Sequence, residues 1–210
     1  MIDPWDGEDL LKWAAQEKVK LTGVLNTHSH HDHIRGNQVL IDAGVPLLTS
    51  APMLTSHAVP GHTLDHVAFR LHDAPHFFPG DTLFQAGVGN CKNGGDPGVL
   101  YRTVAQLQTL LTDETVIHVG HDYLAKNLSF ALHLEPNNQT VRERLQALDT
   151  QVSYELPPHT WGEEQQLNPF LRLGVPEIQQ RLRELNPDLA SGATSDEMLF
   201  RALRSLRDHF

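Results

Sequence analysis

The sequence predicts an α/β domain followed by a helical C-terminal domain. Short apolar segments alternate with amphipathic helical segments over the first half of the chain, and this alternation favours a layered α/β fold. From about residue 124 onward, the pattern is helix and loop with no convincing strand. Histidine and aspartate residues directly follow several predicted strands. We therefore predict domains at 1–123 and 124–210, with a site at one edge of the sheet.

The predicted first domain consists of short elements. Residues 8–18 and 34–44 have helical periodicity, and Gly44 fits the position just after a helix end. Asp96 and Pro97 predict the start of a helix over 96–111, as its N-cap and first helical residue. The segments with strand-like composition are 21–27, 45–50, 66–72, 76–78 and 115–120.

The predicted second domain consists of helices with recognisable starts. Residues 123–136 and 141–152 have helical spacing, and Pro176 begins a further helix. Two other helices open with a capping box, in which a Thr side chain and a Glu three residues later satisfy each other's backbone N–H groups. The two predicted pairs are Thr160 with Glu163 and Thr194 with Glu197.

Composition excludes several classes of function. Lys plus Arg is 16 against 26 for Asp plus Glu, a formal charge of −10, which disfavours a nucleic-acid partner. No segment approaches the roughly 18 apolar residues that a membrane helix needs, and the N-terminus does not resemble a signal peptide. The single cysteine, Cys91, excludes a disulfide framework within the chain and favours the cytoplasm.

The segment "NTHSHHDHIRG" crowds four histidines and one aspartate into positions 28 to 33. Alternation at a strand end would place His28 and His30 on one side, and the following turn would bring Asp32 and His33 to a second point. Imidazole and carboxylate together suit zinc, iron or manganese. A histidine-rich surface loop is the alternative. We predict two neighbouring metal sites.

Further ligands must come from elsewhere, because one loop cannot close two sites. His62, Asp81 and His121 each lie beside a glycine in a predicted turn. A carboxylate such as Asp81 can bridge two cations, which histidine cannot do. The predicted metal ligands are His28, His30, Asp32, His33, His62, Asp81 and His121.

Four motifs in this order, "THSHHDH", "GHTLDH", "GDTLF" and "GHDY", resemble those of the metallo-β-lactamase superfamily. The stretch "VIHVGHDYLAKNLSFALHLEPNN" and the later "NPFLR" resemble the hydroxyacylglutathione hydrolase (glyoxalase II) branch. The resemblance implies an αββα sandwich with a helical C-terminal domain that helps to bind glutathione. It also implies a metal-dependent hydrolase of thioesters, acting on a small-molecule glutathione conjugate such as an S-2-hydroxyacylglutathione.

The resemblance divides the ligands between two divalent metal ions. His28, His30 and His62 would hold one ion, whereas Asp32, His33 and His121 would hold the other. Asp81 would bridge them. Zinc is the expected metal, with iron and manganese as alternatives. A water shared by two dications loses a proton near neutral pH and can attack the thioester, with Asp32 and Asp81 as the catalytic carboxylates.

The remaining polar residues receive weaker predictions. His31 is expected to face outward, His57, His66 and His118 to be structural, and Cys91 to be a buried thiol rather than a nucleophile. Basic and aromatic side chains are expected to bind the substrate, because glutathione carries carboxylates. These are Lys92, Tyr123, Lys126 and Arg172.

The sequence also departs from the family. Relatives carry about one more strand pair before "IDPWDG" and run through extra strands where this chain has only residues 51–61 before His62. In "CKNGG", Lys92 occupies the basic position of the family's glutathione-binding turn, but the aromatic residue is missing.

Three alternatives remain open. A persulfide dioxygenase would use a single iron held by His28, His62 and Asp81. A nuclease or phosphodiesterase of the superfamily is disfavoured by the acidic charge balance. A non-catalytic metal-binding remnant is the third.

Overall fold

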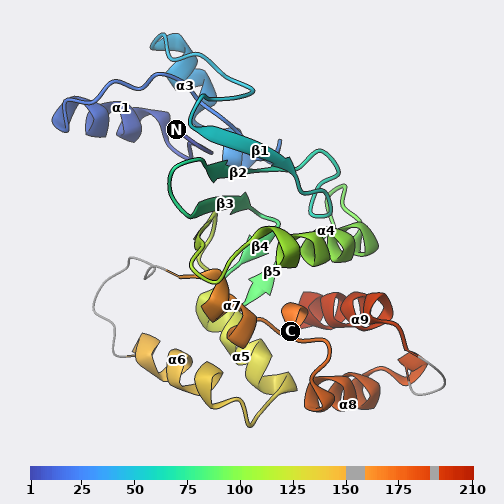
Figure 1. Cartoon of the computed structure of the whole chain (residues 1–210). Coiled ribbons are helices and arrows are strands. Elements are labelled where there is room, and N and C mark those ends of the chain that lie inside the picture. The colour runs from blue at the N-terminus through green and yellow to red at the C-terminus, as the bar shows by residue number, and fades with distance from the viewer. Residues whose placement is uncertain (150–158, 190–193) are drawn as a thin grey trace.

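The computed structural model describes residues 1–149, 159–189 and 194–210. In Figure 1 the helices of the first forty residues lie at one end, the β-strands in the middle and the C-terminal helices at the other end. The helices of the N-terminal half are α1 (Gly7–Gln16), α2 (His31–Ile34), α3 (Asn37–Asp42) and α4 (Pro97–Leu110). None of the described helices is long and apolar enough to cross a bilayer.

One four-stranded sheet positions the site. Its strands are β1 (Leu54–Ala58), β2 (Val67–Leu71), β3 (His76–Gly80) and β6 (Val116–Val119), in the order β1-β2-β3-β6. The first two pairings are antiparallel, whereas β3 and β6 are parallel, with Gly80 opposite Val119. The carboxyl ends of β3 and β6 therefore meet at one edge. A small hairpin of β4 (Leu83–Phe84) and β5 (Gly87–Val88) follows β3.

The predicted strands at 21–27 and 45–50 are reduced to isolated bridges. Leu25 pairs with Ile2 and Val24 pairs with Leu47, both in parallel. The ladder is short because Pro46 has no N–H to donate. Its carbonyl oxygen accepts a hydrogen bond from Val24 N–H, with 2.9 Å between N and O. The second sheet of the sandwich is present among the described residues only as these extended segments.

Two local features of the N-terminal half differ from the prediction. Strand β1 was not predicted, because its sequence, "LTSHA", is short and partly exposed at the sheet edge. The predicted helix 34–44 is split at Gly36, whose N–H donates to Pro4 O at 2.8 Å. A Cβ at Gly36 would lie 2.7 Å from that same oxygen, so only glycine allows this close approach.

The other predicted helices of this half are confirmed. Helix α1 lies within one or two residues of the prediction, with Asp6 as its N-cap. Asp96 caps α4 by accepting from the N–H groups of Gly98 and Val99. Gly44 follows α3 with φ of +84°, the left-handed conformation that the position after a helix requires.

The C-terminal half is helical, as predicted. Its α-helices are α5 (Leu124–Leu134), α6 (Gln139–Asp149), α7 (Trp161–Leu167), α8 (Pro176–Leu185) and α9 (Asp196–His209). Thr160 and Glu163 form the predicted capping box. The Thr194–Glu197 box is wrong, because α9 begins one residue later and Ser195 caps it by accepting from Met198 N–H. Residues 150–152 of the predicted helix 141–152 lie outside the described residues.

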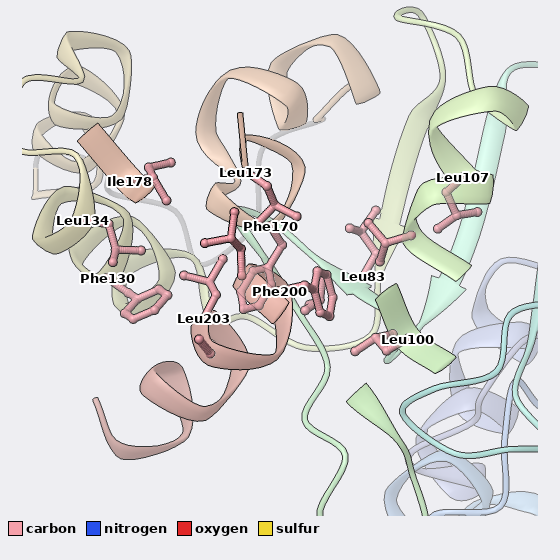
Figure 2. Close-up of a cluster of buried hydrophobic side chains, with 14 of the residues drawn as sticks. Leu83, Leu100, Leu107, Phe130, Leu134, Phe170, Leu173, Ile178, Phe200 and Leu203 are labelled. Atoms are coloured by element: carbon pink, nitrogen blue, oxygen red, sulfur yellow. The ribbon is translucent and has the colours of Figure 1, made fainter. Parts of the chain in front are cut away.

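One large cluster of buried apolar side chains joins the two halves of the chain. Figure 2 shows Leu83 and Leu100 from the first half near Phe170 and Phe200 from the second, and all belong to one cluster of buried side chains. Phe200 is fully buried and packs edge-on against Phe170, with 5.1 Å between ring centroids. The proposed boundary between residues 123 and 124 stays a prediction.

Candidate metal centre

The structure brings all seven predicted metal ligands together. They lie where the extended segment 24–25 leads into α2, in the loop before β2, and just after β3 and β6. Ligand atoms gather within 4.8 Å of one another in three overlapping groups. The groups are His28, His30 and His62; His28, His33 and Asp81; and Asp32, His33 and His121.

The first group offers three ring nitrogens to a common point. His30 Nδ1 lies 3.0 Å from His28 Nε2 and 3.0 Å from His62 Nε2. Zn–N bonds of about 2.0–2.1 Å in a tetrahedral site separate neighbouring nitrogens by roughly 3.3–3.4 Å. The spacing of the three imidazoles is therefore close to that of ligands around one ion.

The group of Asp32, His33 and His121, called the second group below, has the same character with one carboxylate. His121 Nε2 lies 3.2 Å from His33 Nε2 and 3.1 Å from Asp32 Oδ2. The third edge, between His33 Nε2 and Asp32 Oδ2, is 3.9 Å. Two nitrogens and one oxygen at these separations suit a second divalent ion.

Asp81 lies between the two groups. Its Oδ2 is 3.6 Å from His62 Nε2 in the first group, and its Oδ1 is 3.2 Å from His33 Nε2 in the second. Oδ1 is buried and accepts no hydrogen bond of normal geometry, its nearest charged neighbour being the His33 ring, so a cation bound there would satisfy it. The donor set, the spacing and this buried oxygen together fit a pair of divalent ions bridged by one carboxylate.

The backbone before Asp81 is shaped to aim it. Gly80 ends β3 with φ of +52°, and a Cβ there would lie 2.5 Å from Thr27 Oγ1. The N–H of Asp81 donates to His66 Nε2 at 3.1 Å, and the ring of His66 stacks on His28. His66 was predicted to be structural, and it is a buried residue that holds the backbone of Asp81 in place.

Asp3 supports both groups and was not predicted. Its carboxylate accepts from Thr27 N–H and Thr27 Oγ1, both at 2.7 Å, and from His33 Nδ1 at 2.8 Å. Thr27 Oγ1 lies 3.0 Å from His28 Nδ1. With Nδ1 engaged, Nε2 of His28 and of His33 faces the metal site. Asp3 has a positive φ of 51°, an uncommon conformation that aspartate tolerates.

Burial and charge set the protonation of these histidines. Burial lowers the pKa of His28 to about 3 and also lowers the pKa of His62, so both rings are neutral and can coordinate a cation. Burial opposes protonation of His33 too, but its hydrogen bond to Asp3 and the charge of Asp81 raise its pKa to about 10. Metal binding at His33 must therefore displace a proton.

The other predicted histidine and cysteine positions can be located. His31 is exposed, as predicted. His57 lies on β1 near the ring of Phe77. His118 Nε2 lies at hydrogen-bond distance, 2.8 Å, from His76 Nδ1. Cys91 is partly buried rather than fully buried as predicted, and this burial raises the pKa of its thiol to about 11, which suits the predicted inert role.

Three of the four predicted substrate-binding residues line one pocket. Lys92, Tyr123 and Lys126 surround a cavity of about 250 Å³. The ring of Tyr123 stacks on His121, with 5.6 Å between centroids, so this pocket adjoins the metal centre. Arg172 does not line it, because Arg172 Nη2 pairs with Glu135 Oε1 at 2.6 Å.

Two arginines of α9, Arg204 and Arg207, also line this pocket and were not predicted. Arg204 is buried and donates to Val88 O at 2.7 Å, whereas Arg207 donates to Asn127 Oδ1 at 2.9 Å. The sequence feature that could have identified them is their spacing of three residues, which places both on one face of a helix.

Comparison with known proteins agrees with the fold and the motifs. Residues 2–50 match the model of the metallo-beta-lactamase superfamily, and residues 122–210 match the model described as hydroxyacylglutathione hydrolase C-terminus. Among solved structures, ETHE1 from Myxococcus xanthus has a TM-score of 0.59 at 21% identity, covering 98% of this chain and 86% of that one. The BLEG-1 B3 metallo-beta-lactamase also has a TM-score of 0.59 at 21% identity, covering 81% and 87%. These likenesses show the fold.

Curated relatives are more similar in sequence. A hydroxyacylglutathione hydrolase of Polaromonas sp. is 35% identical over 240 aligned positions, covering 100% of this chain and 89% of the relative. One from Nitrosococcus oceani is 35% identical, covering 99% of this chain and 88% of the relative. The chain therefore belongs to the hydroxyacylglutathione hydrolase family, within the metallo-β-lactamase superfamily.

Proposed function

We propose that this protein hydrolyses S-2-hydroxyacylglutathiones to glutathione and a 2-hydroxy acid. The observation that carries the proposal is the position of Asp81, whose two carboxylate oxygens face two separate groups of metal ligands. The names of the curated relatives support the same reaction class. A single-metal site would not need both groups.

The chain's own residues divide the work around the site. Two divalent ions, when bound by these residues, would supply an acidified water and polarise the carbonyl of the thioester. Asp81 sets the separation of the two groups, and His66 fixes Asp81 through its backbone N–H. Asp32 Oδ2, 3.1 Å from His121 Nε2, lies at the rim and is partly exposed, so it can also accept a hydrogen bond from the attacking water.

The pocket beside Tyr123 is the proposed glutathione site. Lys92, Lys126 and Arg207 give it positive charge, which favours the carboxylates of glutathione. The Tyr123 ring connects this pocket to His121, so a thiol held here would place its sulfur near the metal centre. We assign zinc as the metal because five of the seven ligands are imidazoles. The lone Cys91 suits a reducing cytoplasm.

The first test is hydrolysis of S-lactoylglutathione by metal-loaded protein, with metal content measured by elemental analysis. Wild-type protein is expected to hold two ions and to release thiol. Asp81→Ala is expected to lose metal and at least a thousandfold of kcat/KM, because both groups lose their shared ligand. His31→Ala, an exposed residue within the same motif, is the matched control and should keep both.

The same protein should be assayed for oxygen uptake with glutathione persulfide. The rival persulfide dioxygenase needs one iron, and its activity would consume oxygen. Full turnover of the persulfide by protein holding one iron, with no thioester hydrolysis, would contradict the proposal. The intact second group of Asp32, His33 and His121 favours hydrolysis.

A further inference from the structure

A second, larger cavity reaches the metal centre from the side of Asp32, His33 and His121. Its volume is about 870 Å³. None of the residues that line it also lines the pocket beside Tyr123. The metal centre therefore adjoins two separate spaces, and His121 connects them, since it lines the larger one and stacks on Tyr123 of the other.

The walls of this cavity are mostly apolar, and Thr22 and His118 are the polar lining residues outside the cluster of metal ligands and their hydrogen-bond partners. Most of its polar groups belong to one connected cluster, in which Asp3 bonds His33 at 2.8 Å and Asp32 lies 3.1 Å from His121. The side chains of Leu71 and other apolar residues are only half buried because they face the cavity. These wall residues are Leu48, Leu54, Leu71, Phe78 and Val119.

We propose that this cavity receives the acyl group of the substrate, so that the protein prefers thioesters of 2-hydroxy acids with a large apolar side chain. The inference rests on the proposed function and names its substrate class. With the thiol carrier beside Tyr123 and the carbonyl at the ligand cluster, the acyl chain extends past His121 into the apolar space. The 2-hydroxyl and carbonyl then lie at the polar end of the cavity.

The size of the cavity decides between small and large acyl groups. Pockets of about 300–1,000 Å³ hold drug-sized ligands, so a three-carbon lactoyl group would fill only a small part of it. Each additional methylene that leaves water for an apolar wall favours binding by about fourfold. An acyl group of six to eight carbons places several methylenes in the cavity and so gains this factor several times. The gain raises kcat/KM when the transition state makes the same contacts.

Part of the cavity wall lies just beyond the region that matches the superfamily model. The superfamily match ends at residue 50, and residues 51–54 line the cavity. The Polaromonas relative aligns over 240 positions with a chain of 210 residues, so about thirty of its positions have no counterpart here.

The kinetic test compares glutathione thioesters of lactate, 2-hydroxyhexanoate and 2-hydroxyoctanoate on the metal-loaded protein. We expect kcat/KM to rise with chain length and to be at least tenfold higher for 2-hydroxyhexanoyl than for lactoyl. Equal values across the series, or a maximum at lactoyl, would overturn the acyl-site assignment while leaving thioester hydrolysis intact. Hydrolysis of none of the three by protein holding two metals would instead contradict the proposed function.

A cavity-filling variant tests the location. Leu71→Trp at the end of β2 places a large side chain in the cavity, and the preference for 2-hydroxyoctanoyl over lactoyl should fall toward one. Met198→Trp, at an exposed position of α9 outside both cavities, is the matched control and should keep the wild-type preference. An unchanged preference in Leu71→Trp would place the acyl group elsewhere.

A binding measurement makes the test independent of turnover and of the folding of that variant. Trp5 lines the cavity and is 55% exposed, so an apolar ligand should shift its fluorescence to shorter wavelength. We expect this shift with 2-hydroxyoctanoate but not with lactate, and its loss in Trp5→Phe. A shift that depends on protein concentration rather than on ligand would show that a second copy fills the cavity, and would overturn the proposal.

Discussion

At the scale of single residues, Asp3 does more than its place in the sequence indicates. Three hydrogen bonds hold its carboxylate, two from Thr27 and one from His33. Nothing nearby in the sequence marks it, because its partners lie more than twenty residues away. A carboxylate that orients a metal-binding histidine through its second ring nitrogen also raises the basicity of that ligand.

Removing the charge of Asp3 tests this role. Asp3→Asn keeps a side chain that tolerates the left-handed backbone but weakens the bonds to Thr27 and His33. Metal affinity is expected to fall about 10- to 100-fold, measured by competition with a chromogenic chelator. Asp9→Ala, at an exposed position on α1, should bind metal normally. Equal affinity in Asp3→Asn and wild type would show that the carboxylate does not support the ligands.

The thiol of Cys91 provides a second test at this scale. Burial raises its pKa to about 11, so the thiolate fraction at pH 8 is about a hundredfold smaller than that of a free cysteine with a pKa near 8.5–9. Alkylation by iodoacetamide at pH 8 should therefore be at least a hundredfold slower in the folded protein than in urea. Comparable rates would contradict an inert, partly buried thiol.

At the scale of elements, the hydroxyls of Thr194 and Ser195 have different roles at the start of α9. Ser195→Ala removes the side chain that accepts from Met198 N–H and should lower the free energy of unfolding by about 1 kcal/mol. Thr194→Ala lies one position before the cap and should change it by less than about 0.5 kcal/mol. Urea denaturation measures both. The reverse order would place the helix start at Thr194.

The elements predicted well from the sequence are those specified locally. Asp96 and Thr160 cap their helices within three or four residues, so their chemistry is visible in a short window. The segment 21–27 looks like a strand, but a strand needs partners, and Pro46 cannot donate to it. The candidate metal ligands could be predicted because their motifs are dense, and the fold brings them together, whereas Asp3 and Arg204 act through contacts that only the fold creates.

At the scale of the whole molecule, the shared core predicts cooperative unfolding. Phe200 of α9 packs against Tyr101 of α4 as well as Phe170, so the largest cluster of buried side chains among the described residues is shared by the two predicted domains. Phe200→Ala should lower the free energy of unfolding by about 3–5 kcal/mol. Far-ultraviolet circular dichroism and metal release should follow one transition. Two separated transitions would show that 1–123 and 124–210 fold independently.

The chain of hydrogen bonds through Asp3 has a consequence for how the ions are taken up. Thr27 Oγ1 contacts His28, which belongs to one ligand group, and Asp3 contacts His33, which belongs to the other. An ion that orients either ring also orders this shared link and lowers the entropic cost of seating its neighbour. When metal is added in an amount that fills half of all sites, the protein should thus divide into empty and fully loaded molecules. Native mass spectrometry can separate these by mass.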